Sequence, residues 1–216
     1  MKKLIQFGEN VEGYEIPVLN EREIRAGAGI LFLTLFMSWM FILFKQDFTV
    51  LKYGVTLFLF DLSIRVFINP KYSPILIIGR LIVSNQTPEY VGAKQKKFAW
   101  IIGISLSSIL FIFMVLLNSY SPITGIACMV CLIFLFLESS FGICVGCKIY
   151  SRIYKEKAQL CPGEVCVDKV KQPIQRTSKG QYLIVVGFIV FFVLTGLMFN
   201  DWLSLKPLDM FGVYNK

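Results

Sequence analysis

Long apolar stretches alternate with short polar segments along this chain. Several stretches approach the roughly 20 apolar residues that a helix needs to cross the hydrocarbon core of a bilayer. Apolar residues make up 56% of the 216 residues, more than in ordinary soluble domains. We therefore predict an all-α, polytopic membrane helix bundle with about five spans: Ala26–Phe44, Leu51–Ile68, Phe98–Leu117, Ile123–Lys148 and Tyr182–Phe199.

The apolar segment Ser73–Ser84 is too short to cross a membrane. Pro70 and Pro74 precede it and interrupt any helix that continues from the second span. We expect a short re-entrant or interfacial segment here. The chain then divides into a cytoplasmic N-terminal segment (1–25), a four-span core (26–148) with the broken segment at 73–84, a cytoplasmic cysteine-containing loop (149–181), and a fifth span with a short external tail (182–216).

Positive charges are spread unevenly over the predicted loops. With a cytoplasmic N-terminus, 17 of the 22 lysine and arginine residues fall in the cytoplasmic segments 1–25, 69–97 and 148–181. Cytoplasmic loops of membrane proteins carry such an excess, so we predict a multi-pass protein with a cytoplasmic N-terminus and an external C-terminus. The same bias accounts for the net charge of +8, and no nucleic-acid-binding motif accompanies it.

All six cysteines lie within 39 consecutive residues. Cys144 and Cys147 form a Cys-x-x-Cys pair where the fourth apolar stretch runs out, and Cys161 and Cys166 follow in the next loop. The charge pattern places these four cysteines at or near the cytoplasmic face. Because the cytosol is reducing, a purely structural disulfide is not expected there.

Three hypotheses account for the four inner cysteines. Cys144 and Cys147 could be redox-active, since their spacing allows a reversible disulfide and the nearby cation of Lys148 favours a thiolate. All four sulfurs could instead bind structural zinc, or one cysteine could carry a persulfide. The sequence contains no histidine, which excludes imidazole metal ligands and a Cys–His catalytic pair.

Cys128 and Cys131 lie in the outer half of the fourth predicted span. At a spacing of three residues they share a helix face, and buried cysteine commonly serves as a small apolar residue. The alternative is an outer station of a thiol relay. About 24 Å of helix separates Cys128 from Cys144, and thiol exchange needs sulfur contact, so that relay requires a moving element.

Three charged residues, Asp61, Arg65 and Glu138, fall inside predicted spans. Intramembrane charges usually face a bundle interior or a wet cavity, so we expect an ion-paired core in which one carboxylate can bind a proton. This core is either a clasp between helices or a site that handles protons or ions near the thiols. Arg80, in the broken segment, is either an interface residue reaching toward the headgroups or an anion contact.

Several short motifs resemble one bacterial membrane family. They are Asn20-Glu21-Arg22, Asp61 with Arg65, Ser73-Pro74, Lys97-Phe98-Ala99 and, most specifically, Phe141-Gly-Ile-Cys-Val-Gly-Cys-Lys-Ile-Tyr150. Over roughly residues 15–170 the chain resembles the family called domain of unknown function 4395, mainly a four-span core, to which the fifth span is an addition. The resemblance implies the bacterial cytoplasmic (inner) membrane and a link to thioredoxin-like or sulfurtransferase partners, and it assigns no reaction.

The leading functional hypothesis is a membrane thiol–disulfide exchange protein without a cofactor. It would relay reducing equivalents, or sulfane sulfur, between a cytoplasmic thioredoxin-like partner and the membrane or its far side. Cys144 and Cys147 would be the working pair, and Cys161 and Cys166 a mobile loop pair that passes electrons to them. One alternative is a transporter for a small sulfur-containing anion, contacted by Arg65 and Arg80. Another is a non-catalytic assembly subunit whose inner cysteines clamp zinc.

Overall fold

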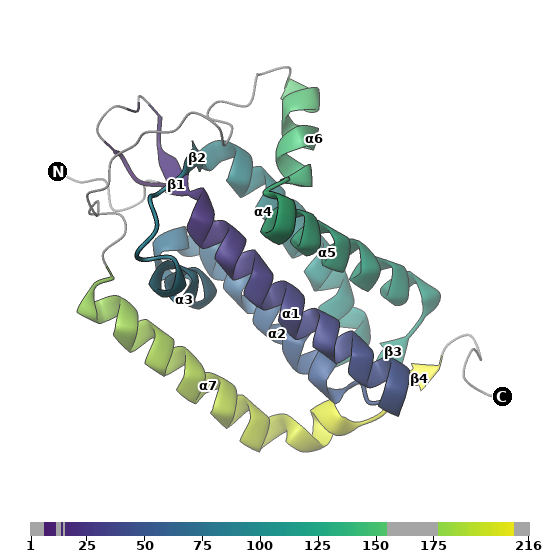
Figure 1. Cartoon of the computed structure of the whole chain (residues 1–216). Helices are drawn as coiled ribbons and strands as arrows, with labels where there is room; N and C mark the ends of the chain where they lie inside the picture. Colours follow the sequence, from purple (N-terminus) through teal and green to yellow (C-terminus); the bar gives the residue numbers. More distant parts are fainter. Residues whose placement is uncertain (1–6, 12–13, 15, 155–176, 210–216) are drawn as a thin grey trace.

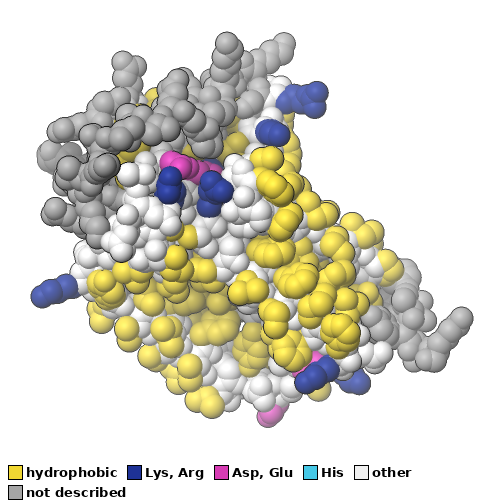
Figure 2. All heavy atoms as spheres, in the orientation of Figure 1, with side chains coloured by type: hydrophobic (Ala, Val, Ile, Leu, Met, Phe, Trp, Pro, Cys, Tyr) yellow, Lys and Arg dark blue, Asp and Glu magenta, His cyan; other side chains and the backbone are white. Residues whose placement is uncertain are grey.

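Long helices dominate the computed structural model, which describes residues 7–11, 14, 16–154 and 177–209 (Figure 1). The predicted all-α bundle is therefore confirmed. On the face shown in Figure 2, hydrophobic side chains cover the middle and charged side chains lie mostly toward the ends. Four helices in the described part of the chain are long and apolar enough to cross a membrane: Glu21–Lys45 (α1), Ala93–Leu116 (α4 with its end), Pro122–Phe141 (α5) and Lys179–Ser204 (α7).

The second predicted span changes its helical winding. The helix α2 covers Thr49–Ser63 and continues as a π-helical segment, Ile64–Ile68. A 3-10 turn follows at Pro70–Tyr72. The end of the span matches the sequence prediction, because proline has no N–H with which to continue the helical hydrogen bonds. The third span behaves similarly, since α4 proper ends at Phe111 and Ile112–Leu116 is π-helical.

The broken apolar segment forms a short buried helix, α3 (Pro74–Ile82). It begins at Ser73, whose hydroxyl oxygen accepts a hydrogen bond from the N–H of Leu76 at 3.2 Å. Its packing against α1 is close: a Cβ on Gly79 would lie 2.7 Å from the carbonyl oxygen of Glu23. The segment therefore needs glycine at this point, where the two helix backbones nearly touch.

Short strand pairings join elements at both ends of the bundle (Figure 1). The strand β1 (Val18–Asn20) pairs antiparallel with β2 (Tyr90–Gly92), and the two strands lead directly into α1 and α4. At the other end, β3 (Ser119–Tyr120) pairs in parallel with β4 (Leu208–Asp209). The first pairing fixes the starts of α1 and α4 next to each other, and most of the buried charges lie near these starts.

The helix α1 runs through the middle of the bundle and packs against α2, α3 and α5 (Figure 1). Buried apolar side chains between these helices form the core, among them Leu31, Leu35, Phe58 and Leu135. The helix α7 packs against α2 and α3, and most of its apolar side chains are exposed. Such a surface is typical of a helix that faces lipid.

The fourth span is shorter than the sequence predicts. The predicted span was Ile123–Lys148, but α5 ends at Phe141. Gly142 has a φ of 65°, in the left-handed region, and caps the C-terminus of α5. A separate helix, α6 (Val145–Tyr154), then sets off in a new direction and packs against α4 (Figure 1). The Cys-x-x-Cys pair therefore lies at the start of a short helix and not within a span.

Candidate thiol site

Cys144 and Cys147 lie at the N-terminal end of α6. Cys144 directly precedes the helix, and the backbone N–H of Cys147 donates a hydrogen bond to its sulfur at 3.4 Å. Both side chains are half-buried and both are free thiols. The N-terminus of a helix carries a partial positive charge, which favours the thiolate form of a cysteine placed there.

The two thiols differ in acidity. The hydrogen bond from the Cys147 side chain lowers the pKa of Cys144; burial acts in the opposite direction, and the charge of Lys96 lowers the pKa further. The same hydrogen bond, together with burial, raises the pKa of Cys147. Cys144 is therefore the more acidic of the two thiols.

Gly146 allows α6 to approach α4 closely. A Cβ at this position would lie 2.5 Å from the Cβ of Ala99 and 2.6 Å from its Cα. No side chain fits between these two backbones without moving one of them. The contact holds the two cysteines near the part of α4 that carries Lys96.

Lys96 joins two carboxylates from other helices. Its Nζ lies 2.8 Å from Oε2 of Glu21 on α1 and 2.8 Å from Oε1 of Glu138 on α5. The side chains of Lys96 and Glu21 are 1% and 2% exposed, and that of Glu138 is 16% exposed. Two carboxylates and one ammonium leave a net charge of −1 near the thiols, and the charges of Lys96 and Glu138 both act on Cys144 and Cys147.

Asp61 and Arg65 form a buried ion pair, with Nε of Arg65 at 2.7 Å from Oδ2 of Asp61. The other carboxylate oxygen of Asp61 accepts hydrogen bonds from the hydroxyl of Ser73 at 2.6 Å and from the N–H of Ile75 at 3.1 Å. These bonds fasten α2 to the start of α3. The expected single cluster of Asp61, Arg65 and Glu138 is thus divided, because Glu138 pairs with Lys96.

A cavity of about 60 Å³ lies below the start of α6. Arg65, Trp100, Cys131, Glu138 and Cys144 all contribute to its lining, and most of the remaining wall is apolar. The cavity therefore brings the working thiol together with a predicted proton-handling carboxylate and with one of the two candidate relay cysteines. Cys128 is not part of it and lines a separate cavity nearer the other end of α5.

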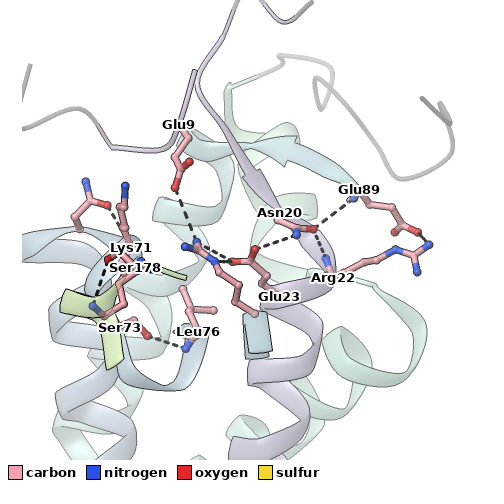
Figure 3. A network of polar contacts seen from close by, with 12 residues as sticks. Glu9, Asn20, Arg22, Glu23, Lys71, Ser73, Leu76, Glu89 and Ser178 are labelled. Atoms are coloured by element: carbon pink, nitrogen blue, oxygen red, sulfur yellow. Dashed lines mark hydrogen bonds and ion pairs between the residues drawn. The ribbon is translucent and has the colours of Figure 1, made fainter. Parts of the chain in front are cut away.

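Arg80 belongs to a second buried ion pair. Its Nε donates to Oε2 of Glu23 at 3.0 Å, and Glu23 also accepts a hydrogen bond from the Asn20 side chain at 3.0 Å. Figure 3 shows Asn20 and Glu23 close together at the start of α1, with Arg22 directed toward Glu89. Arg80 is only 6% exposed. The interpretation of Arg80 as an interface residue is therefore wrong, and it fastens α3 to α1 instead.

Arg22→Gln is expected to change the free energy of unfolding by less than about 1 kcal/mol. The variant removes the ion pair in which Nη2 of Arg22 lies 2.6 Å from Oε1 of Glu89. Both side chains are about one-third exposed, so solvent screens the pair. Denaturant unfolding in detergent micelles measures the change. A loss similar to that from a buried ion pair would contradict this account of the Arg22–Glu89 contact.

The remaining predicted site residues are only partly placed. Lys148, which was predicted to favour a thiolate, is exposed on α6. The charge that lowers the pKa of Cys144 is that of Lys96. Cys161 and Cys166 lie outside the described residues, so the loop pair and the four-sulfur zinc site both stay predictions. Among the residues that the structure describes, no group of three or more Cys, Asp or Glu side chains is arranged to hold a metal ion.

The sequence alone did not indicate Lys96, Glu21 or Trp100 as site residues. Lys96 was assigned to a basic cytoplasmic loop, although it lies within the first turn of α4 and is buried. The helical period gives a signal that could have found it: positions 93, 96, 100 and 103 are three or four residues apart and share one face. That face carries Ala93, Trp100 and Gly103, which are small or apolar and typical of a packed side.

One known protein family matches most of the helix bundle, including the thiol site. The sequence model of a family described as "Domain of unknown function (DUF4395)" matches residues 19–155, more than half of the chain. The chain belongs to this family. In this DUF4395 protein the matched residues include α1 to α6 with Cys144 and Cys147, whereas α7 lies beyond the match. No curated protein and no solved structure matches the chain.

Proposed function

We propose that this DUF4395 protein is a membrane thiol–disulfide exchange protein that relays reducing equivalents through Cys144 and Cys147. One observation carries most of the support: Cys144 precedes the first turn of α6 and accepts the Cys147 N–H at 3.4 Å. The more acidic thiol of the pair thus lies beside the less acidic one. Thiol exchange uses such a pair, one thiol as the attacking group and the other to resolve the intermediate.

The exchange proceeds in two steps. The Cys144 thiolate attacks a disulfide of the partner protein, forms a mixed disulfide and expels one partner thiolate. Cys147 then loses its proton and attacks the Cys144 sulfur, which forms the Cys144–Cys147 disulfide and expels the second partner thiolate. Two electrons pass to the partner, and the same steps in reverse reduce the pair.

The partner that we propose is a cytoplasmic thioredoxin-like protein. The charge bias of the predicted loops supports an orientation in the bacterial cytoplasmic membrane in which the start of α6 faces the reducing cytosol. Cys161 and Cys166 would exchange with the working pair from the following loop. Transfer of sulfane sulfur from a sulfurtransferase is an alternative use of the same thiolate.

The transport hypothesis has less support. It requires Arg65 and Arg80 to contact an anionic substrate, whereas Arg65 is paired with Asp61 and Arg80 with Glu23. Both carboxylates are buried, so binding an anion would leave them without their cations at a large energetic cost.

Alkylation trapping in cells is expected to show the Cys144–Cys147 pair in both redox states. The disulfide fraction should rise when the cytoplasmic reductant is disabled. Cys144→Ser should abolish exchange, and Cys147→Ser should stabilise a mixed disulfide, because the resolving thiol is missing. Cys128→Ala serves as the control, since it removes a buried thiol away from the site. A pair that stays reduced under every condition, with an unaffected Cys144→Ser variant, would rule the function out.

A further inference from the structure

The second step of exchange needs a group that takes the proton of Cys147. Its thiol donates a hydrogen bond to Cys144 in the resting state, and the same bond raises its pKa. Once Cys144 is part of a mixed disulfide it carries no charge and cannot accept that proton. A resolving thiol of this kind ionises quickly only with a base nearby.

We propose that Glu138 accepts the proton of Cys147 through water in the 60 Å³ cavity, and that Lys96 positions Glu138 for this role. The proposal rests on the proposed function. Glu138 and Cys144 line the same cavity, and Cys147 is hydrogen-bonded to Cys144. Glu138 would therefore act as a general base and return the proton when exchange runs in reverse.

The cavity has the size and the polar groups that water requires. Its volume of about 60 Å³ exceeds the space that one water needs, and a water also needs two or more polar partners. Glu138, Arg65 and Cys144 provide polar groups in the lining. Trp100 also lines the cavity, is 4% exposed, and its indole N–H has no acceptor among the described residues. A bridging water would satisfy that buried donor.

Glu138, and not Glu21, is the carboxylate suited to this task. Glu21 contacts Lys96 through both carboxylate oxygens, at 3.0 and 2.8 Å, and is 2% exposed. Glu138 contacts Lys96 through Oε1 and also lines the cavity. Other charged groups also lie around the two thiols or the cavity and shape the local field. Arg25 lies beside Gly142, Arg65 is paired with Asp61, and Lys148 is exposed.

A chromogenic aromatic disulfide, dithiobis(nitrobenzoate), separates the two steps. Attack by Cys144 releases one coloured thiolate, and resolution by Cys147 releases a second. The parent protein is the full chain in detergent with the substitutions Cys128→Ala, Cys131→Ala, Cys161→Ser and Cys166→Ser, so that only the working pair reacts. Fast and slow colour release then report the attack and the resolution separately.

Glu138→Gln should slow the second release on the order of 100-fold at neutral pH and make its rate rise with pH, because hydroxide replaces the missing base. The first release should change little, which also shows that the variant is folded. Glu138→Asp should recover part of the rate. Glu21→Gln is the matched control: it removes the other carboxylate on Lys96 and should leave the second release much faster than Glu138→Gln does.

Three results would overturn the proposal while leaving the exchange function intact. They are an unchanged second release in Glu138→Gln, an equal slowing of both releases, and an equal effect of Glu21→Gln and Glu138→Gln. A parent protein that gives no first release would instead overturn the exchange function, and with it the role of Glu138.

Discussion

Lys96→Met is expected to lower the free energy of unfolding by about 3–5 kcal/mol, the cost of breaking a buried ion pair by removing one partner. Lys96 is 1% exposed and lies 2.8 Å from both Glu21 and Glu138. Methionine fills a similar volume without a charge, so two carboxylates would stay in the bundle without their cation. Leaving buried charges unpaired is costly because the surroundings replace little of the lost solvation. Denaturant unfolding in detergent micelles measures the loss.

Two further variants isolate the cause of this loss. Lys97→Met removes the adjacent lysine, which is half-buried over the ring of Phe7 with Nζ 4.9 Å from the centroid, and should cost about 1 kcal/mol or less. Adding Glu21→Gln and Glu138→Gln to Lys96→Met removes all three charges and should restore most of the stability. Equal losses for Lys96→Met and Lys97→Met would show that Lys96 does not hold the two carboxylates together.

The buried ion pairs show which contacts can be predicted from the sequence. Asp61 and Arg65 were expected in an ion-paired core, and they lie four residues apart on one helix, so their contact depends only on helical geometry. Lys96 contacts Glu21, which is 75 positions away in the sequence, and Arg80 contacts Glu23, which is 57 positions away. These pairs depend on how the helices pack. A charge count assigns such residues to the loops, because it cannot distinguish a buried cation at a helix end from a solvated one.

The boundary of the fourth span was missed for a different reason. Hydropathy stays high from Ile123 toward Lys148 and does not register a change of direction in the backbone. Gly142 and Gly146 have separate roles: Gly142 ends α5 with a positive φ, and Gly146 permits contact with Ala99. Only the packed structure distinguishes a glycine that caps a helix from one that allows close approach.

This break also changes the expected surroundings of Cys144. The spacing along a single continuous helix placed the outer cysteines far from Cys144. Because α5 stops at Phe141 and α6 starts against α4, Cys131 and Cys144 instead line one cavity. Cys131 therefore contributes to the surroundings of the thiolate, whereas Cys128 stays in the core toward the other end of the bundle.

Gly146→Ala is expected to slow attack by Cys144 about 100-fold, the scale of loss that a misplacement near 1 Å causes at a reacting group. The added Cβ would lie 2.5 Å from the Cβ of Ala99 and 2.6 Å from its Cα, distances that non-bonded carbon atoms do not tolerate. Because part of the clash is with the backbone of α4, a rotamer change cannot relieve it. The start of α6 must then move away from Lys96, and Cys144 loses part of the charge interaction that favours its thiolate.

The first release from the chromogenic disulfide measures this effect directly. Gly187→Ala, on α7, is the matched control, because a Cβ there would meet nothing within 4 Å, and it should leave the rate unchanged. Adding Ala99→Gly to Gly146→Ala removes the closest contact but not the contact with the Ala99 Cα, so it should restore the rate only in part. A normal rate in Gly146→Ala would mean that the reactivity of Cys144 does not depend on the close packing of α6 against α4.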